Sequence, residues 1–336
     1  MRIPANLGEH CRIITEEAID IDRCFRDFSV AAGEKLLRYY MAPVLKYMPT
    51  GLRYAVTDIA KRLRNPSRKV NLNYPMDFIE NRKIVRRLKN DLRPWWGKKA
   101  VVSISHDVDN DRGYAFVSRM AEMDHKAGIM SAFNFLTHDN YVPDKSVLEH
   151  LKGMGMEIGL HGYTHDQGFA FRSRVNMAKQ LAAALSALEG LGITGIRTPA
   201  LSKSRAYFAA IREAGLKYDS SMQIGSGIYQ GVRLPYPYYF EEFGIWEIPL
   251  MIQDDNYLRD SATNEKDMLS SIIRFIEETI ALNGVMVLNM HPHLMCDRSS
   301  LYLKVLDALS DYKKEVSFTA TGMIYEYAEQ QRKENV

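Results

Sequence analysis

The pattern of apolar and polar positions changes at about residue 100. From there, short apolar or β-branched runs alternate with segments whose apolar positions recur at helical spacing. The runs are KKAVVSIS, SAFNFLT, MEIGLH, GIRTP, WEIPLM, VMVLNMH and VSFTAT. The helical segments between them cover 144–154, 174–191, 203–214 and 265–282. This alternation is typical of repeated βα units, and about seven strands favour a closed or nearly closed α/β barrel over an open doubly wound sheet.

Residues 1–99 follow a different pattern. Within them, 36–64 place apolar, tyrosine and basic residues as short amphipathic helices would, with Pro43 and Pro49 as interruptions. We therefore predict a helical, basic N-terminal extension over 1–99 and a barrel over 100–336. The helices either cover one end of the barrel or lie on an anionic membrane surface, and the first arrangement is the commoner one for amphipathic stretches.

Composition excludes a disordered or fibrous protein. The 336 residues are 46% hydrophobic and 25% charged, and no stretch approaches the roughly 20 apolar residues of a membrane-spanning helix. The net charge of +3 conceals a basic region, because 46–99 hold fifteen Lys and Arg against four acids. Such an excess favours an anionic partner, with a solvated helix face as the plain alternative.

Cysteine use and the first residues bear on location. Cys11, Cys24 and Cys296 lack the close spacing of a zinc site or a disulfide framework, which agrees with a reducing compartment. The start of the chain lacks the basic-then-apolar layout of a signal peptide. We expect a cytoplasmic protein, with peripheral contact at the inner face of the membrane as the alternative that the basic segment allows.

Ionisable side chains follow the predicted strands at the points where the strands end. They are His106, Asp107 and Asp109 at the first run, His161 at the third, Arg197 at the fourth and His291 at the sixth. In an α/β barrel the C-terminal strand ends meet at one mouth, where catalytic groups collect. The sequence therefore predicts one site built from these residues.

Two of the spacings suit a metal ion. Asp107 and Asp109 stand at i and i+2 after one strand, and His161 and His165 stand at i and i+4, so that each pair reaches a common pocket. Alone, DVDN is typical of a turn and the histidine pair is often incidental. Two imidazoles and a carboxylate from a separate strand end together form a facial triad with open positions for water and substrate.

The order HDVD, HGYTH, IRTPA, YDSS and LNMHPH resembles the motif series of the NodB-type polysaccharide deacetylases, carbohydrate esterase family 4, over roughly residues 100 to 320. The resemblance implies a distorted barrel of seven βα units that removes acetyl groups from sugars with a divalent metal, usually zinc. It implies these roles: Asp107 as catalytic base, Asp109, His161 and His165 as metal ligands, Arg197 as the residue that orients the base, His291 as general acid and Asp219 as the carboxylate that tunes His291.

Some positions depart from that series. The first motif reads SHDVD instead of TFDDG, with His106 in place of an aromatic residue, and Met222 lies near the place where a tryptophan is common. Both changes predict a different substrate pocket. Relatives with an FDVD-like motif cleave cyclic amides or ureides, some of them without metal, but the intact HGYTH favours a metal-dependent enzyme.

Together these observations predict a metal-dependent hydrolase that removes an N-acetyl or N-formyl group from a sugar. The basic segment suits a nucleotide-linked or lipid-linked substrate, with surface-polysaccharide or lipid-linked glycan biosynthesis as the setting and no nucleic acid as partner. A cyclic-amide hydrolase is the alternative within the same enzyme class. A non-catalytic glycan-binding barrel is the alternative outside it, although a degenerate relative would be expected to lack one of the site residues.

Other residues allow two interpretations each. Asp254 and Asp255 in IQDDNY suit a solvated turn better than a contact with substrate hydroxyls. His293 lines the pocket or lies on a surface loop. Trp95 and Trp96 stack on a sugar ring or, more commonly, pack in a core.

Overall fold

The computed structural model describes residues 95–224, 230–232, 235–258 and 264–334. The predicted N-terminal extension, apart from 95–99, lies outside the described residues, as do Cys11, Cys24 and most of the basic segment. In chain order the elements are β1 (Ala100–Val108), α5 (Asp111–Tyr114), α6 (Val117–Lys126), β2 (Ala132–Leu136), α7 (Lys145–Gly153), β3 (Glu157–Gly162), η2 (Phe169–Phe171), α8 (Arg174–Ala187), β4 (Gly195–Ile196), η3 (Pro199–Leu201), α9 (Arg205–Glu213), β5 (Tyr218–Asp219), β6 (Gln223–Ile224), β7 (Gln230–Val232), β8 (Tyr238–Phe240), β9 (Ile245–Glu247), β10 (Ile252–Gln253), α10 (Asp255–Leu258), α11 (Glu265–Leu282), β11 (Val285–Asn289), α12 (Pro292–Met295), α13 (Ser299–Ser310), β12 (Val316–Phe318) and α14 (Thr321–Lys333).

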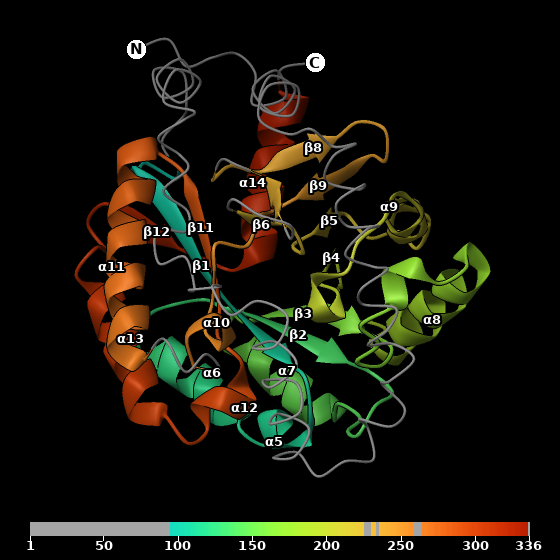
Figure 1. Ribbon diagram of the computed structural model, residues 1–336, viewed down its shortest axis with the longest axis horizontal. Helices are drawn as coiled ribbons and strands as arrows, with labels where there is room; N and C mark the ends of the chain where they lie inside the picture. Colours follow the sequence, from blue (N-terminus) through green and yellow to red (C-terminus); the bar gives the residue numbers. More distant parts are fainter. Residues whose placement is uncertain (1–94, 225–229, 233–234, 259–263, 335–336) are drawn as a thin grey trace, which may run out of the picture.

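One curled sheet forms the centre of the molecule, with helices around it (Figure 1). Its order is β10-β11-β1-β2-β3-β4-β5-β9-β8, and β12 pairs with the first part of β1 where β2 pairs with the last part. The pairs are parallel except for the antiparallel pair β8 and β9. Among the described residues β8 and β10 do not pair with each other, so the barrel stays open there. The predicted distorted α/β barrel is confirmed.

Each of the seven apolar runs contributes a strand, and each of the four predicted helical segments contains a helix. The long central strand β1 is buried along its whole length, and the polar side chains in it have partners, as with Ser103 at Thr321 Oγ1 and Ser105 at the Leu288 carbonyl. Strands β5, β6, β7, β8 and β10 were not predicted. Each of them has only two or three residues, too few to show a period in the sequence.

Strands β4 and β5 are held close by a glycine. A Cβ atom on Gly195 would stand 1.9 Å from a ring carbon of Tyr218, so only glycine lets the two strands approach. The Tyr218 hydroxyl donates to Glu157 Oε1 at 2.5 Å, at the first residue of β3. Strand β4 then stops before Pro199, which has no N–H for a ladder bond.

The N-terminal ends of the strands are closed by α14. An apolar cluster there joins Trp95, Val101 and Ile324, and Glu157 Oε2 accepts from the Gly322 backbone N–H at 2.7 Å. Trp95 is therefore a core residue, the commoner of its two interpretations. Closure of this end leaves the C-terminal strand ends as the open mouth. Among the described helices, none is both long and apolar enough to cross a bilayer.

Candidate active site

Six of the eight predicted site residues meet at the C-terminal ends of the strands. The other two are Asp219 and His106, and the prediction that His106 belongs to the site is wrong because its side chain points to the face of β1 opposite that of Asp107. Asp107 lies on β1 and Asp109 just beyond it, while His161 lies on β3 and His165 in the loop that follows. Arg197 follows β4, and His291 precedes α12 after β11. Helices α5 and α12, which follow β1 and β11, pack against each other beside these ends (Figure 1).

The carboxylate of Asp107 is buried and held on both oxygens. Its Oδ1 accepts from Asn134 Nδ2 at 2.8 Å and from Arg197 Nη1 at 3.2 Å, and its Oδ2 accepts from Asn289 Nδ2 at 2.7 Å. Burial raises the pKa of Asp107, but the positive charges around it, led by Arg197, outweigh burial and lower the pKa. Asp107 is therefore an ionised, oriented carboxylate.

Sequence reasoning missed the two amides that hold Asp107. Asn134 interrupts the apolar run AFNFL of β2, and Asn289 ends the run VMVLN of β11. A lone amide within an otherwise apolar, buried strand is a signal that points to a specific hydrogen-bond partner, because an unpaired buried amide is costly.

Arg197 is held in place by hydrogen bonds to residues other than Asp107. Its Nε donates to the Ser220 carbonyl at 2.7 Å, its Nη2 donates to Ser220 Oγ at 2.8 Å, and its Nη1 donates to Ser105 Oγ at 2.6 Å. The side chain is 1% exposed, so the planar fork is held in one orientation.

The two histidines of HGYTH face Asp109. Oδ1 of Asp109 lies 3.3 Å from His161 Nε2 and 3.5 Å from His165 Nε2, and the three possible ligand atoms all lie within 4.8 Å of one another. His161 Nδ1 donates to the Arg197 carbonyl at 2.7 Å, and this bond orients the ring with Nε2 toward Asp109. Asp139 Oδ2 accepts from the His165 backbone N–H at 2.6 Å and holds that loop.

Two buried atoms of this triad lack a hydrogen bond of good geometry among the described residues, namely Asp109 Oδ1 and His161 Nε2. Burial raises the pKa of Asp109, but His165 and His291 outweigh it and lower the pKa well below its usual value. Two buried polar atoms that converge without a well-formed hydrogen bond, one of them on an ionised carboxylate, suit a divalent cation bound between them. Two imidazoles and a carboxylate are a donor set that zinc and related metals accept.

His291 pairs with a carboxylate that sequence reasoning placed elsewhere. Its Nδ1 lies 2.5 Å from Asp254 Oδ1, and its backbone N–H donates to Asp254 Oδ2 at 2.7 Å. Burial lowers the pKa of His291, but Asp254 and then Asp109 outweigh it and raise the pKa to about 10. His291 is thus cationic at neutral pH, with Nε2 3.9 Å from Asp109 Oδ2.

The predicted pairing of Asp219 with His291 is wrong, and so is the interpretation of Asp254 as a solvated turn. Asp219 accepts from the Tyr207 hydroxyl at 2.5 Å and from Ser221 Oγ at 2.8 Å. The physical reason is sheet order: β5, which carries Asp219, stands four strands away from β1, whereas β10 pairs directly with β11 and brings the buried Asp254 to His291.

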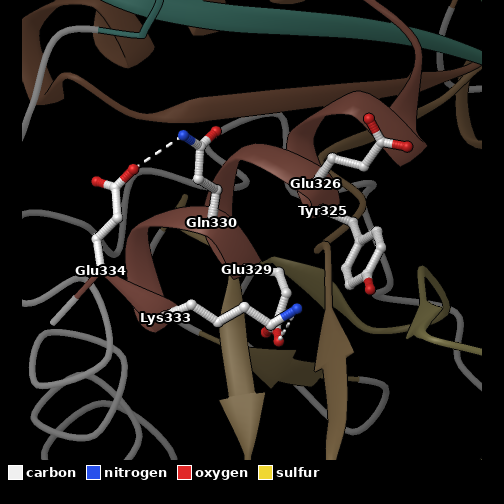
Figure 2. Close-up of a pocket in the computed structure, with 6 residues that line it drawn as sticks. All are labelled: Tyr325, Glu326, Glu329, Gln330, Lys333 and Glu334. Carbon is white, nitrogen blue, oxygen red and sulfur yellow. Dashed lines mark hydrogen bonds and ion pairs between the residues drawn. The ribbon is translucent and has the colours of Figure 1, made fainter. Parts of the chain in front are cut away.

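His293 is 7% exposed, and its Nδ1 lies 3.9 Å from Asp109 Oδ2. The interpretation as a surface-loop residue is therefore wrong, and His293 belongs to the wall of the site. Figure 2 shows a different hollow, on α14 at the closed end of the barrel, lined by Tyr325, Glu326, Glu329, Gln330, Lys333 and Glu334. None of the predicted site residues lines it.

Comparison with known proteins gives the fold. No family model matches the chain, and no curated protein matches it. Among solved structures, an assigned polysaccharide deacetylase from Mycobacterium smegmatis is similar with a TM-score of 0.59 and 17% identity, over 70% of this chain and 92% of that chain. Another from Pseudomonas aeruginosa PAO1 gives 0.56 and 12%, over 71% and 95%. Puue allantoinase gives 0.56 and 13%, over 69% and 91%. The chain thus has the fold of the polysaccharide deacetylases, as the motif order predicted.

Proposed function

We propose that this chain, which has the polysaccharide deacetylase fold, is a metal-dependent hydrolase that removes an N-acetyl or N-formyl group from a sugar. The observation that carries the proposal is the convergence of an ionised carboxylate and two imidazoles, Asp109, His161 and His165, beside the held carboxylate of Asp107. His291 stands on the other side of Asp109 as a buried cation. In this proposal a base, a metal site and an acid lie next to one another.

Asp109, His161 and His165 would hold the divalent ion, for which we propose zinc. A bound ion of this kind supplies a Lewis acid that lowers the pKa of water toward about 7 and polarises a carbonyl. Asp107 accepts the proton from the attacking water. Its ionised state and its direction are set by Arg197 and the two strand amides, so no reorganisation is needed as the proton moves.

His291 supplies the second proton. Water adds to the acyl carbon, and the C–N bond must then break with the amine as leaving group. Unless its nitrogen is protonated, the tetrahedral intermediate expels the water again and returns to substrate. His291 Nε2–H donates its proton to the leaving nitrogen, while Asp254 stabilises the imidazolium through Nδ1. The products are the free amine of the sugar and a carboxylic acid, and the proton taken up by Asp107 restores His291.

The basic segment supports a proposal for the substrate and the setting. We propose a nucleotide-linked or lipid-linked N-acylated sugar in surface-polysaccharide or lipid-linked glycan biosynthesis, because 46–99 carry a strong basic excess that suits a pyrophosphate or an anionic membrane face. In this proposal, 1–99 form a helical extension and 100–336 form the catalytic barrel of a cytoplasmic protein, with peripheral contact at the inner face of the membrane as the alternative use of the basic segment.

A cyclic-amide hydrolase is the second candidate function, favoured by the likeness to Puue allantoinase. The two candidates share water attack on an amide carbon and differ in the leaving group, which stays attached to the product of a cyclic amide. Turnover of a small ureide without turnover of acylated sugars would select this candidate.

The test is acid release from N-acetylated and N-formylated sugars, free and linked to a nucleotide or a lipid pyrophosphate. The parent chain is compared with Asp107→Asn, and Asp307→Asn, at an exposed position of α13, is the matched control. We expect Asp107→Asn to lower kcat by about 10²- to 10⁴-fold, the usual contribution of a general base, and the control to match the parent. Equal turnover by Asp107→Asn and the parent would contradict the assignment of the base.

A further inference from the structure

His106 is a buried ionisable residue next to Asp107, on the face of β1 that the helices cover. His106 is 0% exposed and is the neighbour of Asp107 on the strand, so its side chain points to the opposite face. Its ring lies 4.4 Å from the ring of Phe133 and meets Tyr302 edge-on at 5.9 Å. The catalytic roles proposed above leave this histidine unused.

Both ring nitrogens of His106 face acceptors. Nδ1 lies 2.8 Å from the carbonyl oxygen of Met290, and Nε2 lies 3.0 Å from Asp124 Oδ2. A carbonyl can only accept, so Nδ1 carries a hydrogen. Asp124 also accepts from Ser131 Oγ at 2.6 Å and from the Tyr302 hydroxyl, so both of its oxygens act as hydrogen-bond acceptors. Nε2 therefore donates as well.

The Met290 carbonyl, which accepts from His106, lies between two residues of the site, Asn289 and His291. Backbone pairing between β1 and β11 ends at Ser105 and Asn289, and the last backbone bond runs from the Met290 N–H to the Ser105 carbonyl at 2.9 Å. Beyond this point, hydrogen bonds from side chains connect β1 to the end of β11 and to the segment that follows it. The Asn289 amide holds Asp107, and the His106 ring holds Met290, the residue between Asn289 and His291.

We propose that His106 and Asp124 form a buried imidazolium–carboxylate pair whose role is to fix the Asn289–His291 segment. The pair thereby holds the base Asp107 and the acid His291 at a constant distance and orientation to each other. His106 is then a positioning residue. Its effect on turnover rests on the proposed function, whereas its double protonation does not. The charge on the ring strengthens its bond to the Met290 carbonyl, because charge-assisted hydrogen bonds are about twice as strong as neutral ones.

The first test is nitrogen-15 NMR of the histidine rings in the full chain at neutral pH, with the His106 signals assigned by their loss in His106→Phe. We expect one-bond hydrogen couplings on both ring nitrogens of His106 in the parent. In Asp124→Asn we expect the Nε2 coupling to disappear. An uncoupled Nε2 in the parent would overturn the ion pair, whether or not the chain hydrolyses acylated sugars.

The second test separates positioning from simple stability. His106→Phe keeps the aromatic packing and removes both donors, and His106→Asn keeps one donor near the place of Nδ1. Val102→Ala, also at a buried position of β1, is the matched control for lost stability. We expect His106→Phe to retain metal and KM but lose about 10- to 100-fold in kcat, as for a displacement on the order of 1 Å, with most of this restored in His106→Asn.

The expected control result is an unchanged kcat in Val102→Ala with a lower melting temperature. Equal kcat losses in His106→Phe and Val102→Ala, or an unchanged kcat in metal-loaded His106→Phe, would overturn the positioning role. If the parent shows no hydrolysis of any acylated sugar, the proposed function fails while the NMR result still decides whether the buried pair exists.

Discussion

Asp254 Oδ1 lies 2.5 Å from Nδ1 of His291, and both oxygens of this buried carboxylate serve His291, the second by accepting its backbone N–H. Since 37 residues separate the two, the contact depends on the parallel pairing of β10 with β11. The carboxylate both orients the imidazole and holds its proton, which is the role of the third member of a catalytic triad.

This pair predicts the alkaline side of the pH profile. Because the pKa of His291 is raised to about 10, the protonated acid is present at neutral pH and kcat/KM falls as pH rises through that value. A divalent ion at Asp109 would move the fall to lower pH, since it places positive charge near the imidazolium. Asp254→Asn removes the leading stabilising charge, so we expect its alkaline limb at least about one pH unit below that of the parent.

The measurement is kcat/KM across the pH range at saturating metal. Asp311→Asn, in the turn after α13, removes a carboxylate away from His291 and serves as control. A limb at the same pH in Asp254→Asn and the parent would show that His291 is not the group whose proton is needed.

The close contact between Gly159 and Asn134 predicts that a substitution at Gly159 lowers kcat. A Cβ atom at this position would stand 2.2 Å from Oδ1 of Asn134, so alanine must displace the amide that donates to Asp107. We expect Gly159→Ala to lower kcat by about 10-fold or more, because a base that loses a fixed donor also loses its direction. Gly153→Ala, at the last residue of α7 with no atom within 4 Å of the added carbon, is the matched control and should leave kcat unchanged.

Glu247 predicts how stability depends on pH. It is fully buried, and burial together with neighbouring Asp219 raises its pKa well above the usual 4.5. Above that pH the unfolded chain releases a proton that the folded chain keeps, so this residue makes the free energy of unfolding fall as pH rises. Glu247→Gln removes the difference, so its free energy of unfolding relative to that of the parent should increase as pH rises above about 4.5.

Urea unfolding at several pH values measures this difference. Glu241→Gln, on the exposed turn between β8 and β9, is the control and should follow the parent. A constant gap between Glu247→Gln and the parent across the range would mean that Glu247 is ionised in the folded chain.

The sequence predicted those parts of the fold and site that depend on local pattern. The helix Glu265–Leu282 was predicted with its observed bounds from its helical period, and the structure adds a capping box at Asn264 that fixes its start. His161 and His165 lie close together in one motif, and they meet Asp109 because the parallel strands β1 and β3, on either side of β2, end at the same edge of the sheet.

The parts that the sequence did not predict depend on which strands are neighbours. Asp254 follows a strand of two residues, and nothing local indicates that this strand pairs with β11. Asp219 ends a strand of equal length on another part of the sheet, so the motif order alone selected the wrong carboxylate. Likewise, the partner of His106, Asp124, lies 18 residues along the chain in α6, and only the packed helix brings it to the ring.

The most direct test of a metal-dependent site is the metal content of the full chain, purified without a histidine tag and then equilibrated with Zn²⁺. The account predicts about one tightly bound divalent ion per chain in the parent and in His150→Ala, an exposed histidine of α7, and almost none in folded Asp109→Ala and His161→Ala. A folded parent that takes up no divalent ion, or variants that bind as much as the parent, would contradict it.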